Sequence, residues 1–170
     1  MSFEHPNIAR ALGVFLDSKP PFIVLEYIEG ITLEEEIATR AALDRHWDAE
    51  ALVASFTELA QAVHYAHQFG VVHRDLKPSN VMLESSGQQI RILDFGIAKL
   101  LDSTERAFDT TRGRILGSSF YMSPEQAQGE GVDERTDVFA LTVILVEMLS
   151  LRRAWLKDAG GAPAIAFAEP

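Results

Sequence analysis

The chain has 170 residues, 47% of them hydrophobic, which is enough to form one compact domain of moderate size. Its formal net charge of −10 repels nucleic acid and anionic membrane surfaces, so we expect neither as a partner. Because the chain contains no cysteine, it has no disulfide, no thiolate zinc site and no cysteine nucleophile.

Two apolar segments near the N-terminus predict a β-hairpin. GVFL (13–16) and PFIVLEYI (21–28) are rich in branched and aromatic residues, and the turn-forming segment DSKPP lies between them. Farther along, Thr32 is followed three residues later by Glu35, which fits a capping box. A short helix is therefore expected within EGITLEEEIATR.

The clearest helix is expected between Asp48, which suits the N-cap position, and Gly70, which suits a helix stop. Apolar residues at helical spacing form one stripe along it: Leu52, Phe56, Leu59, Ala60, Val63 and Ala66. His64 and His67 lie three residues apart on this helix, a spacing that would allow a shared metal ion. No third ligand is evident nearby, so ordinary packing roles are favoured for both.

The second half of the chain alternates between short apolar segments and polar ones. NVMLE (80–84) and QIRILDF (89–95) predict a second tight hairpin joined by SSGQ, and residues 98–128 predict a long loop. TDVFALTVILVEMLS (136–150) is apolar nearly all round and predicts a helix that is buried on most sides. Its apolar run is too short to cross a bilayer, so we expect no membrane contact by this chain. Residues 156–170 are expected to form a disordered tail.

Three motifs occur in succession: VVHRDLKPSN (71–80), LDFG (93–96) and SFYMSPE (119–125). An ordinary turn does not need the opposed charges that follow the two valines of the first motif. In this order, with a helix before and a hairpin between, the motifs resemble the signature set of protein kinases. HPNI, FIVLEYIEG and DERTDVFALTVILVEMLS are similar to the flanking segments of that family, so the resemblance covers about residues 4–155.

The resemblance implies an α+β fold of the protein-kinase type. It implies a partial kinase domain over residues 1–155, mainly the helical C-terminal lobe with the hinge and the last strands of the N-terminal lobe. In the family a glycine-rich loop, a strand lysine and a helix glutamate should precede HPNI, and more helices should follow LSLRRAW. We therefore interpret the chain as truncated at both ends. MSPEQ with DERTDVFAL is most similar to the bacterial, eukaryotic-like branch.

The resemblance also assigns the chemistry. Asp75 would accept or orient the proton of a substrate hydroxyl, and Lys77 would stabilise the transferred phosphate. Asn80, a further catalytic-loop residue, and Asp94 would supply hard oxygen ligands to Mg²⁺. The alternative is that Asp75 and Asn80 are turn formers and that Asp94 caps a strand. We favour the site because the three motifs occur together.

Adenine of ATP would lie against the LEYI segment. By resemblance, the backbone of Glu26 and Ile28 corresponds to the hinge that hydrogen-bonds the base, and Leu25 controls access behind it. Met82 would form part of the apolar floor, and Asp94 would reach the nucleotide through the metal. These residues would also belong to a buried strand whether or not a nucleotide binds.

Other residues are expected to support or regulate the site. By resemblance, His73 and Phe95 pack in a core column, and Asp137 accepts backbone hydrogens from the catalytic loop or caps its own helix. Glu125 lacks its usual arginine partner, which is missing or replaced.

Arg74 would pair with a phosphorylated activation-loop residue, with Thr110 and Thr111 preferred over Ser103 and Thr104. In the alternative interpretation these four are ordinary solvated loop residues. Departures from the family pattern are Ser118, Thr142 and Leu151.

We therefore expect a serine/threonine protein kinase fragment that transfers the γ-phosphate of ATP, with Mg²⁺, to hydroxyls of a protein substrate. The alternative is a pseudokinase-like remnant that acts as a protein-binding module, and a small-molecule phosphotransferase is less favoured. We expect a cytoplasmic location, with membrane tethering of the parent protein left open. Self-association through exposed apolar surface is also expected.

Overall fold

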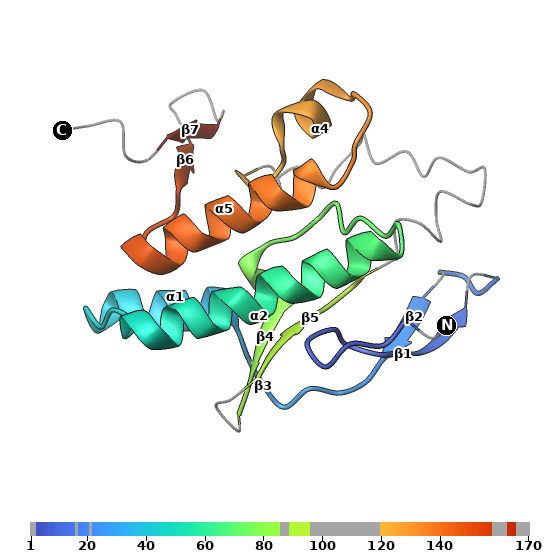
Figure 1. Cartoon of the computed structure of the whole chain (residues 1–170), viewed down its shortest axis with the longest axis horizontal. Helices are drawn as coiled ribbons and strands as arrows, with labels where there is room; N and C mark the ends of the chain where they lie inside the picture. The colour runs from blue at the N-terminus through green and yellow to red at the C-terminus, as the bar shows by residue number, and fades with distance from the viewer. Residues whose placement is uncertain are drawn as a thin grey trace.

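The computed structural model describes residues 3–15, 17–20, 22–85, 89–95, 120–157 and 163–165 (Figure 1). Its helices are α1 (Leu33–Ala42), α2 (Ala49–Gln68), the 3₁₀ turn η1 (Pro78–Asn80), α4 (Pro124–Gln128) and α5 (Arg135–Ser150). Its strands are β1 (Ala11–Phe15), β2 (Phe22–Leu25), β3 (Gly30–Thr32), β4 (Val81–Glu84), β5 (Ile90–Ile92), β6 (Trp155–Lys157) and β7 (Pro163–Ile165). This mixture of helices and small antiparallel sheets is the α+β fold that was predicted.

The predicted N-terminal hairpin is confirmed. β1 and β2 pair antiparallel, and the register shifts between Ala11 and Gly13. Phe15 and Phe22 stack at the turn end with ring centroids 4.7 Å apart, although both side chains are exposed. β1 and β2 pair with no other described strand and form a separate two-stranded sheet.

The second predicted hairpin, β4–β5, is also confirmed, but it carries a third strand that the sequence analysis missed. β3 pairs with β4, and β4 pairs with β5, both antiparallel. The three residues of β3 are too few to show an alternating pattern. Its Gly30 is required by packing, because a Cβ there would lie 2.0 Å from the carbonyl oxygen of Leu83.

Both helix starts predicted from capping residues are confirmed. Thr32 accepts from the Glu35 N–H at 3.2 Å while the Glu35 carboxylate accepts from the Thr32 N–H at 2.8 Å, so the capping box is complete. Asp48 accepts from the backbone N–H groups at the start of α2. α2 ends at its C-cap Phe69, and Gly70 then takes the left-handed conformation with φ of 65°.

The core lies between α2, α5 and the β3–β4–β5 sheet (Figure 1). Most of the predicted α2 stripe is buried, while Phe56 and Ala60 are partly buried and Ala62 is an unpredicted, fully buried member. α5 is less completely covered than predicted, because Val138 and Leu149 are each more than half exposed. The largest fully buried apolar side chains of the core are Leu33, Leu59, Leu76, Ile92, Ile144 and Met148.

Two boundaries differ from the expectations. The loop expected over residues 98–128 contains α4, because Ser123 makes a capping box with Gln126 and Pro124 begins the helix. Leu156 and Lys157 of β6 and the whole of β7 pair inside the segment expected to be disordered, since these residues are mostly larger than the glycines and alanines on which that expectation rested. The other residues of 158–170 lie outside the described residues. No described helix is both long and apolar enough to span a membrane.

Candidate active site

The segment between α2 and β4 contains the expected catalytic loop. Its own buried side chains anchor it in the core. His73, Leu76 and Pro78 are buried, whereas Arg74 and Asp75 between them are exposed. Arg74 has a φ of 67°, a backbone conformation that is unfavourable for a residue with a Cβ and is kept only when surrounding contacts hold it. The loop therefore presents its charged side chains to solvent on a fixed backbone.

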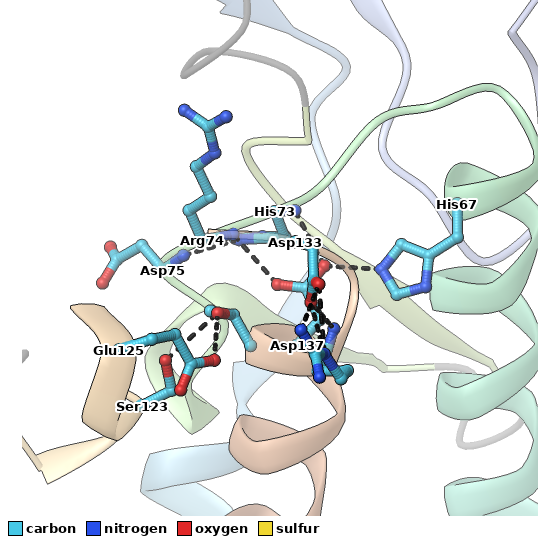
Figure 2. Close-up of polar contacts among 10 residues, drawn as sticks. His67, His73, Arg74, Asp75, Ser123, Glu125, Asp133 and Asp137 are labelled. Atoms are coloured by element: carbon cyan, nitrogen blue, oxygen red, sulfur yellow. Dashed lines mark hydrogen bonds and ion pairs between the residues drawn. The ribbon is translucent and has the colours of Figure 1, made fainter. Parts of the chain in front are cut away.

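Asp137 provides those contacts. Its side chain is fully buried, and its carboxylate accepts from the His73 N–H at 2.8 Å and from the Arg74 N–H at 3.0 Å. His67 of α2 contacts the same carboxylate through Nε2 at 2.7 Å (Figure 2). The N-cap of α5 is Glu134, and it makes no side-chain cap. Asp137 thus contacts the catalytic loop, as the resemblance implied, and α2 as well, which was not expected.

Asp75, Lys77 and Asn80 form one cluster. Lys77 Nζ lies 2.6 Å from Asp75 Oδ2, and the Asn80 amide nitrogen donates to the Asp75 carbonyl oxygen at 2.8 Å. The Asp75 carboxylate remains 52% exposed although it is paired. It can therefore be reached by a substrate hydroxyl, which is the first geometric requirement for a base.

The β4–β5 hairpin brings Asp94 beside Asn80. Asn80 directly precedes β4 and Asp94 is the second residue after β5, and the Leu93 N–H donates to the Asn80 carbonyl oxygen at 2.8 Å. Asp94 has a φ of 60°, which aspartate tolerates better than most residues. Two oxygen-bearing side chains that lie far apart in the sequence are thereby placed at the same end of the hairpin.

This donor set fits Mg²⁺. Because Asp75 offers only oxygens to the Asn80 side chain, the nearby Asn80 atom must be nitrogen, and the amide oxygen points elsewhere. Among the described contacts that oxygen has no donor, so it and the Asp94 carboxylate are available to a hard cation. No group of three or more His, Cys, Asp or Glu that could hold a metal occurs among the described residues.

His73 and Phe95 pack as the resemblance implied. Their rings meet edge to face with centroids 4.7 Å apart, and His73 Nε2 lies 2.9 Å from the Leu93 carbonyl oxygen. His64 contacts Gln68 through Nε2 at 3.2 Å. His67 contacts the Asp137 carboxylate, so the described polar contacts of all three histidines are hydrogen bonds within the fold.

The residues that the resemblance assigns to the hinge adjoin the same hairpin. Leu25 ends β2, Glu26 follows it, and β3 begins two residues after Ile28. Met82 pairs with Thr32 across the β3–β4 ladder, which brings the floor residue next to the end of the hinge. The structure adds a contact that was not predicted, because the Glu26 carboxylate accepts from Arg91 Nη1 of β5 at 3.0 Å.

Glu125 has hydroxyl partners in place of the usual arginine. The Thr136 hydroxyl donates to Glu125 Oε1 at 2.8 Å, and Ser123 lies 3.1 Å from the same Thr136 hydroxyl. The backbone N–H of Glu125, then the Thr136 and Ser123 hydroxyls, lower the pKa of its carboxyl. Among the described residues, the side-chain hydrogen-bond partners of Glu125 are hydroxyls and not an arginine.

Two further residues were missed from sequence, one that binds the catalytic loop and one that is buried in α5. Gln126 of α4 donates through Nε2 to the Arg74 carbonyl oxygen at 2.7 Å. Glu147 is buried in α5, where it accepts from the Tyr121 hydroxyl at 2.8 Å and from the Ala154 N–H at 3.0 Å. A glutamate within the apolar run VILVEML was a usable signal, because a buried carboxylate needs partners.

The regulatory prediction is only partly covered by the structure. In Figure 2 the Arg74 side chain points away from Asp137, and Arg74 is an exposed residue. Thr110, Thr111, Ser103, Thr104 and Ser118 lie outside the described residues.

Comparison with known proteins decides the family. The sequence model of the protein kinase domain family matches residues 1–164 of this chain. The chain belongs to the protein kinase family. It is 38% identical over 147 residues to the probable serine/threonine-protein kinase PknB of Bifidobacterium longum, covering 86% of this chain and 20% of that protein. It is 38% identical over 151 residues to the serine/threonine-protein kinase PrkC of Bacillus subtilis, covering 89% and 22%.

A third relative is the serine/threonine-protein kinase PknB of Mycolicibacterium smegmatis, 36% identical over 161 residues, with 92% of this chain and 25% of that protein covered. These relatives agree with the bacterial branch suggested by MSPEQ and DERTDVFAL. The chain spans about a fifth to a quarter of the length of the curated relatives it matches.

Proposed function

We propose that this chain carries the phosphoryl-transfer part of a bacterial-type serine/threonine protein kinase, which uses ATP and modifies hydroxyls of a protein substrate. The observation that carries the proposal is the Asp75–Lys77–Asn80 cluster beside Asp94 at the open end of the β4–β5 hairpin. Phosphoryl transfer needs positioning and charge neutralisation more than covalent chemistry, and this cluster offers both.

Each residue then has a role. Asp75 accepts or orients the proton of the substrate hydroxyl, and Lys77, held 2.6 Å from it, stabilises charge on the transferred phosphate. Asn80 and Asp94 hold Mg²⁺, which when bound supplies positive charge at the phosphates. The hinge backbone at Glu26 and Ile28 would hydrogen-bond adenine, and Met82 would form part of the apolar floor beneath it.

A second part of the proposal is control by phosphorylation. Arg74 is exposed beside Asp75, and it would bind a phosphate on Thr110 or Thr111, which would order the activation segment. Arginine suits this task because its planar guanidinium pairs with phosphate through two hydrogen bonds.

A cytoplasmic location follows if ATP is the phosphate donor. Self-association through exposed apolar residues of the β1–β2 hairpin is proposed on the exposure of Leu12, Phe15 and Phe22.

The test is transfer of labelled γ-phosphate from ATP to a library of serine- and threonine-containing peptides. Asp75→Asn should lower the transfer rate at least about 100-fold, because it removes the base but keeps the shape. Asp133→Asn is the matched control, since Asp133 is an exposed aspartate in an ion pair with Arg135 away from the cluster, and its rate should be unchanged. Equal rates for wild type and Asp75→Asn would refute the assignment. Binding of Mg–ATP without any transfer would favour a binding module instead.

A further inference from the structure

A three-residue ion-pair cluster joins the hinge to the β4–β5 hairpin. Arg91, in the middle of β5, donates through Nη1 to Glu26 Oε1 at 3.0 Å and through Nε to Glu84 Oε1 at 2.8 Å. The same Glu26 oxygen also accepts from the backbone N–H of Arg10 at 2.9 Å. One guanidinium therefore connects the residue after β2, the end of β4 and, through Glu26, the residue before β1. We call these three side chains the hinge clasp.

The clasp bridges two parts of the fold that are also joined just before β1, where Ile8 forms an isolated parallel bridge with Ile92 of β5. The β1–β2 sheet and the β3–β4–β5 sheet share no ladder among the described strands. The face between them is hollowed by a cavity of about 690 Å³ that is lined by Arg10, Glu26, Arg91 and Phe95, among others. Side-chain packing therefore does not fill the space on this face, and the clasp is a polar contact across it.

The clasp also completes the support of the hinge. The far end of the hinge is tied to β4, because the Ser85 N–H donates to the Glu29 carbonyl oxygen at 2.8 Å and β3 then pairs with β4. The near end is tied by Arg91 to the Glu26 side chain, while the Glu26 backbone N–H donates to the Arg10 carbonyl oxygen at 2.9 Å. Only Tyr27, which is 91% exposed, and Ile28 lie between these two anchors. The hinge backbone is thus fixed at both ends relative to β5, which leads through Leu93 to Asp94.

Arg91 also acts through its positive charge. It separates two carboxylates, and without it Glu26 and Glu84 would face each other with like charge. All three side chains are only 21–26% exposed, so solvent screens them less than the exposed pair of Arg135 and Asp133. Loss of Arg91 should therefore push the hinge away from the hairpin as well as release it.

We propose that Arg91 is a positioning residue for the nucleotide: by holding Glu26 against β5, it sets the hinge at the distance from Asp94 that a single Mg–nucleotide must span. This proposal rests on the proposed function for its ligand. Arg91 does not contact the reacting atoms, so its loss should weaken nucleotide binding more than it slows the chemical step.

The first measurement is the dissociation constant of Mg–ADP by calorimetry, together with KM for ATP and kcat. Arg91→Ala should raise the dissociation constant and KM about fivefold or more, with kcat changed less than about twofold. Arg91→Lys keeps the charge but cannot bridge both carboxylates, so its effect should be intermediate. Arg135→Ala removes an arginine from an exposed ion pair and is the matched control, with unchanged binding. Unchanged or tighter Mg–ADP binding by Arg91→Ala would overturn the proposal.

The second measurement does not depend on nucleotide. Hydrogen exchange at the Arg10 amide, which donates to the Glu26 carboxylate, should quicken in Arg91→Ala and not in Arg135→Ala. Glu84→Gln, which leaves both backbone ladders intact, should quicken it less, and it provides a second variant if Arg91→Ala folds poorly. Unchanged exchange in both would refute the clasp. If wild type binds no Mg–ADP, the proposed function fails for this chain, whereas the exchange rates still decide whether Arg91 holds the hinge.

Discussion

Replacement of Asp137 by asparagine tests the idea that one buried carboxylate fixes the catalytic loop. Asp137 accepts from two backbone N–H groups, those of His73 and Arg74, and contacts His67 Nε2. An asparagine of the same shape has one acceptor oxygen, so its NH₂ group must face one of these donors. At least one buried backbone N–H is then left without an acceptor.

The magnitude follows from these contacts. An orphaned buried donor costs about 1–3 kcal/mol, and the remaining hydrogen bonds lose the strength that the negative charge gives them. We expect Asp137→Asn to lower the free energy of unfolding by about 3 kcal/mol, which is a large part of the 5–15 kcal/mol of a typical domain. For a chain of this size that corresponds to a drop in Tm of about 6–12 °C.

The assay is urea unfolding followed by circular dichroism, with hydrogen exchange at the Arg74 amide as a local readout. Asp133→Asn is the control, because Asp133 is an exposed aspartate just before the same helix and its ion pair with Arg135 is open to solvent. Its unfolding midpoint should not move. If Asp137→Asn unfolds at the same urea concentration as Asp133→Asn and the Arg74 amide stays protected, the anchoring role is wrong.

Two further predictions concern packing and pH. Gly30→Ala should destabilise the chain by about 1–3 kcal/mol or more, because its Cβ would lie 2.0 Å from the Leu83 carbonyl oxygen. Gly131→Ala, which has nothing within 4 Å of its Cβ, should leave the urea midpoint nearly unchanged, and equal midpoints for the two variants would contradict this. Burial raises the pKa of the Glu147 carboxyl above its ordinary 4.5, and the Tyr121 hydrogen bond partly offsets this rise. The folded state therefore binds more protons than the unfolded state. The free energy of unfolding should fall as pH rises from about 4.5 through the folded pKa. Glu147→Gln should flatten that decline in urea midpoints measured across the range, whereas a pH profile identical to wild type would show that Glu147 does not cause it.

The features predicted correctly from sequence are those whose signals lie within a few residues. The capping box at Thr32, the N-cap at Asp48 and the two hairpins are each specified by neighbours in the chain, and each is confirmed. The order of the three motifs identified the family because such a combination is specific even without a structure. A short helix such as α4 also had a local signal, since Ser123 with Gln126 is a capping box, but the surrounding polar residues obscured it.

The features that were missed depend on contacts between distant residues. β3 is three residues long and is a strand only because β4 lies beside it. The partners of Asp137 on α2 and of Glu125 on α5 lie 70 and 11 residues away, respectively, so no spacing rule finds them. The hinge clasp joins positions 65 residues apart, and sequence reasoning assigned Glu26 only a backbone role.

Together these contacts explain how a segment with little regular structure can hold a precise site. Between α2 and β4 only the three residues of η1 are regular, yet the unfavourable backbone angle at Arg74 is maintained. Asp137 binds the loop from α5, Gln126 binds the Arg74 carbonyl from α4, and the Asn80 carbonyl accepts from Leu93 of the hairpin. Each anchor comes from an element packed on the same core. The geometry of Asp75 is therefore set by the helical body, and damage to any one anchor should change the position of the base before it unfolds the domain.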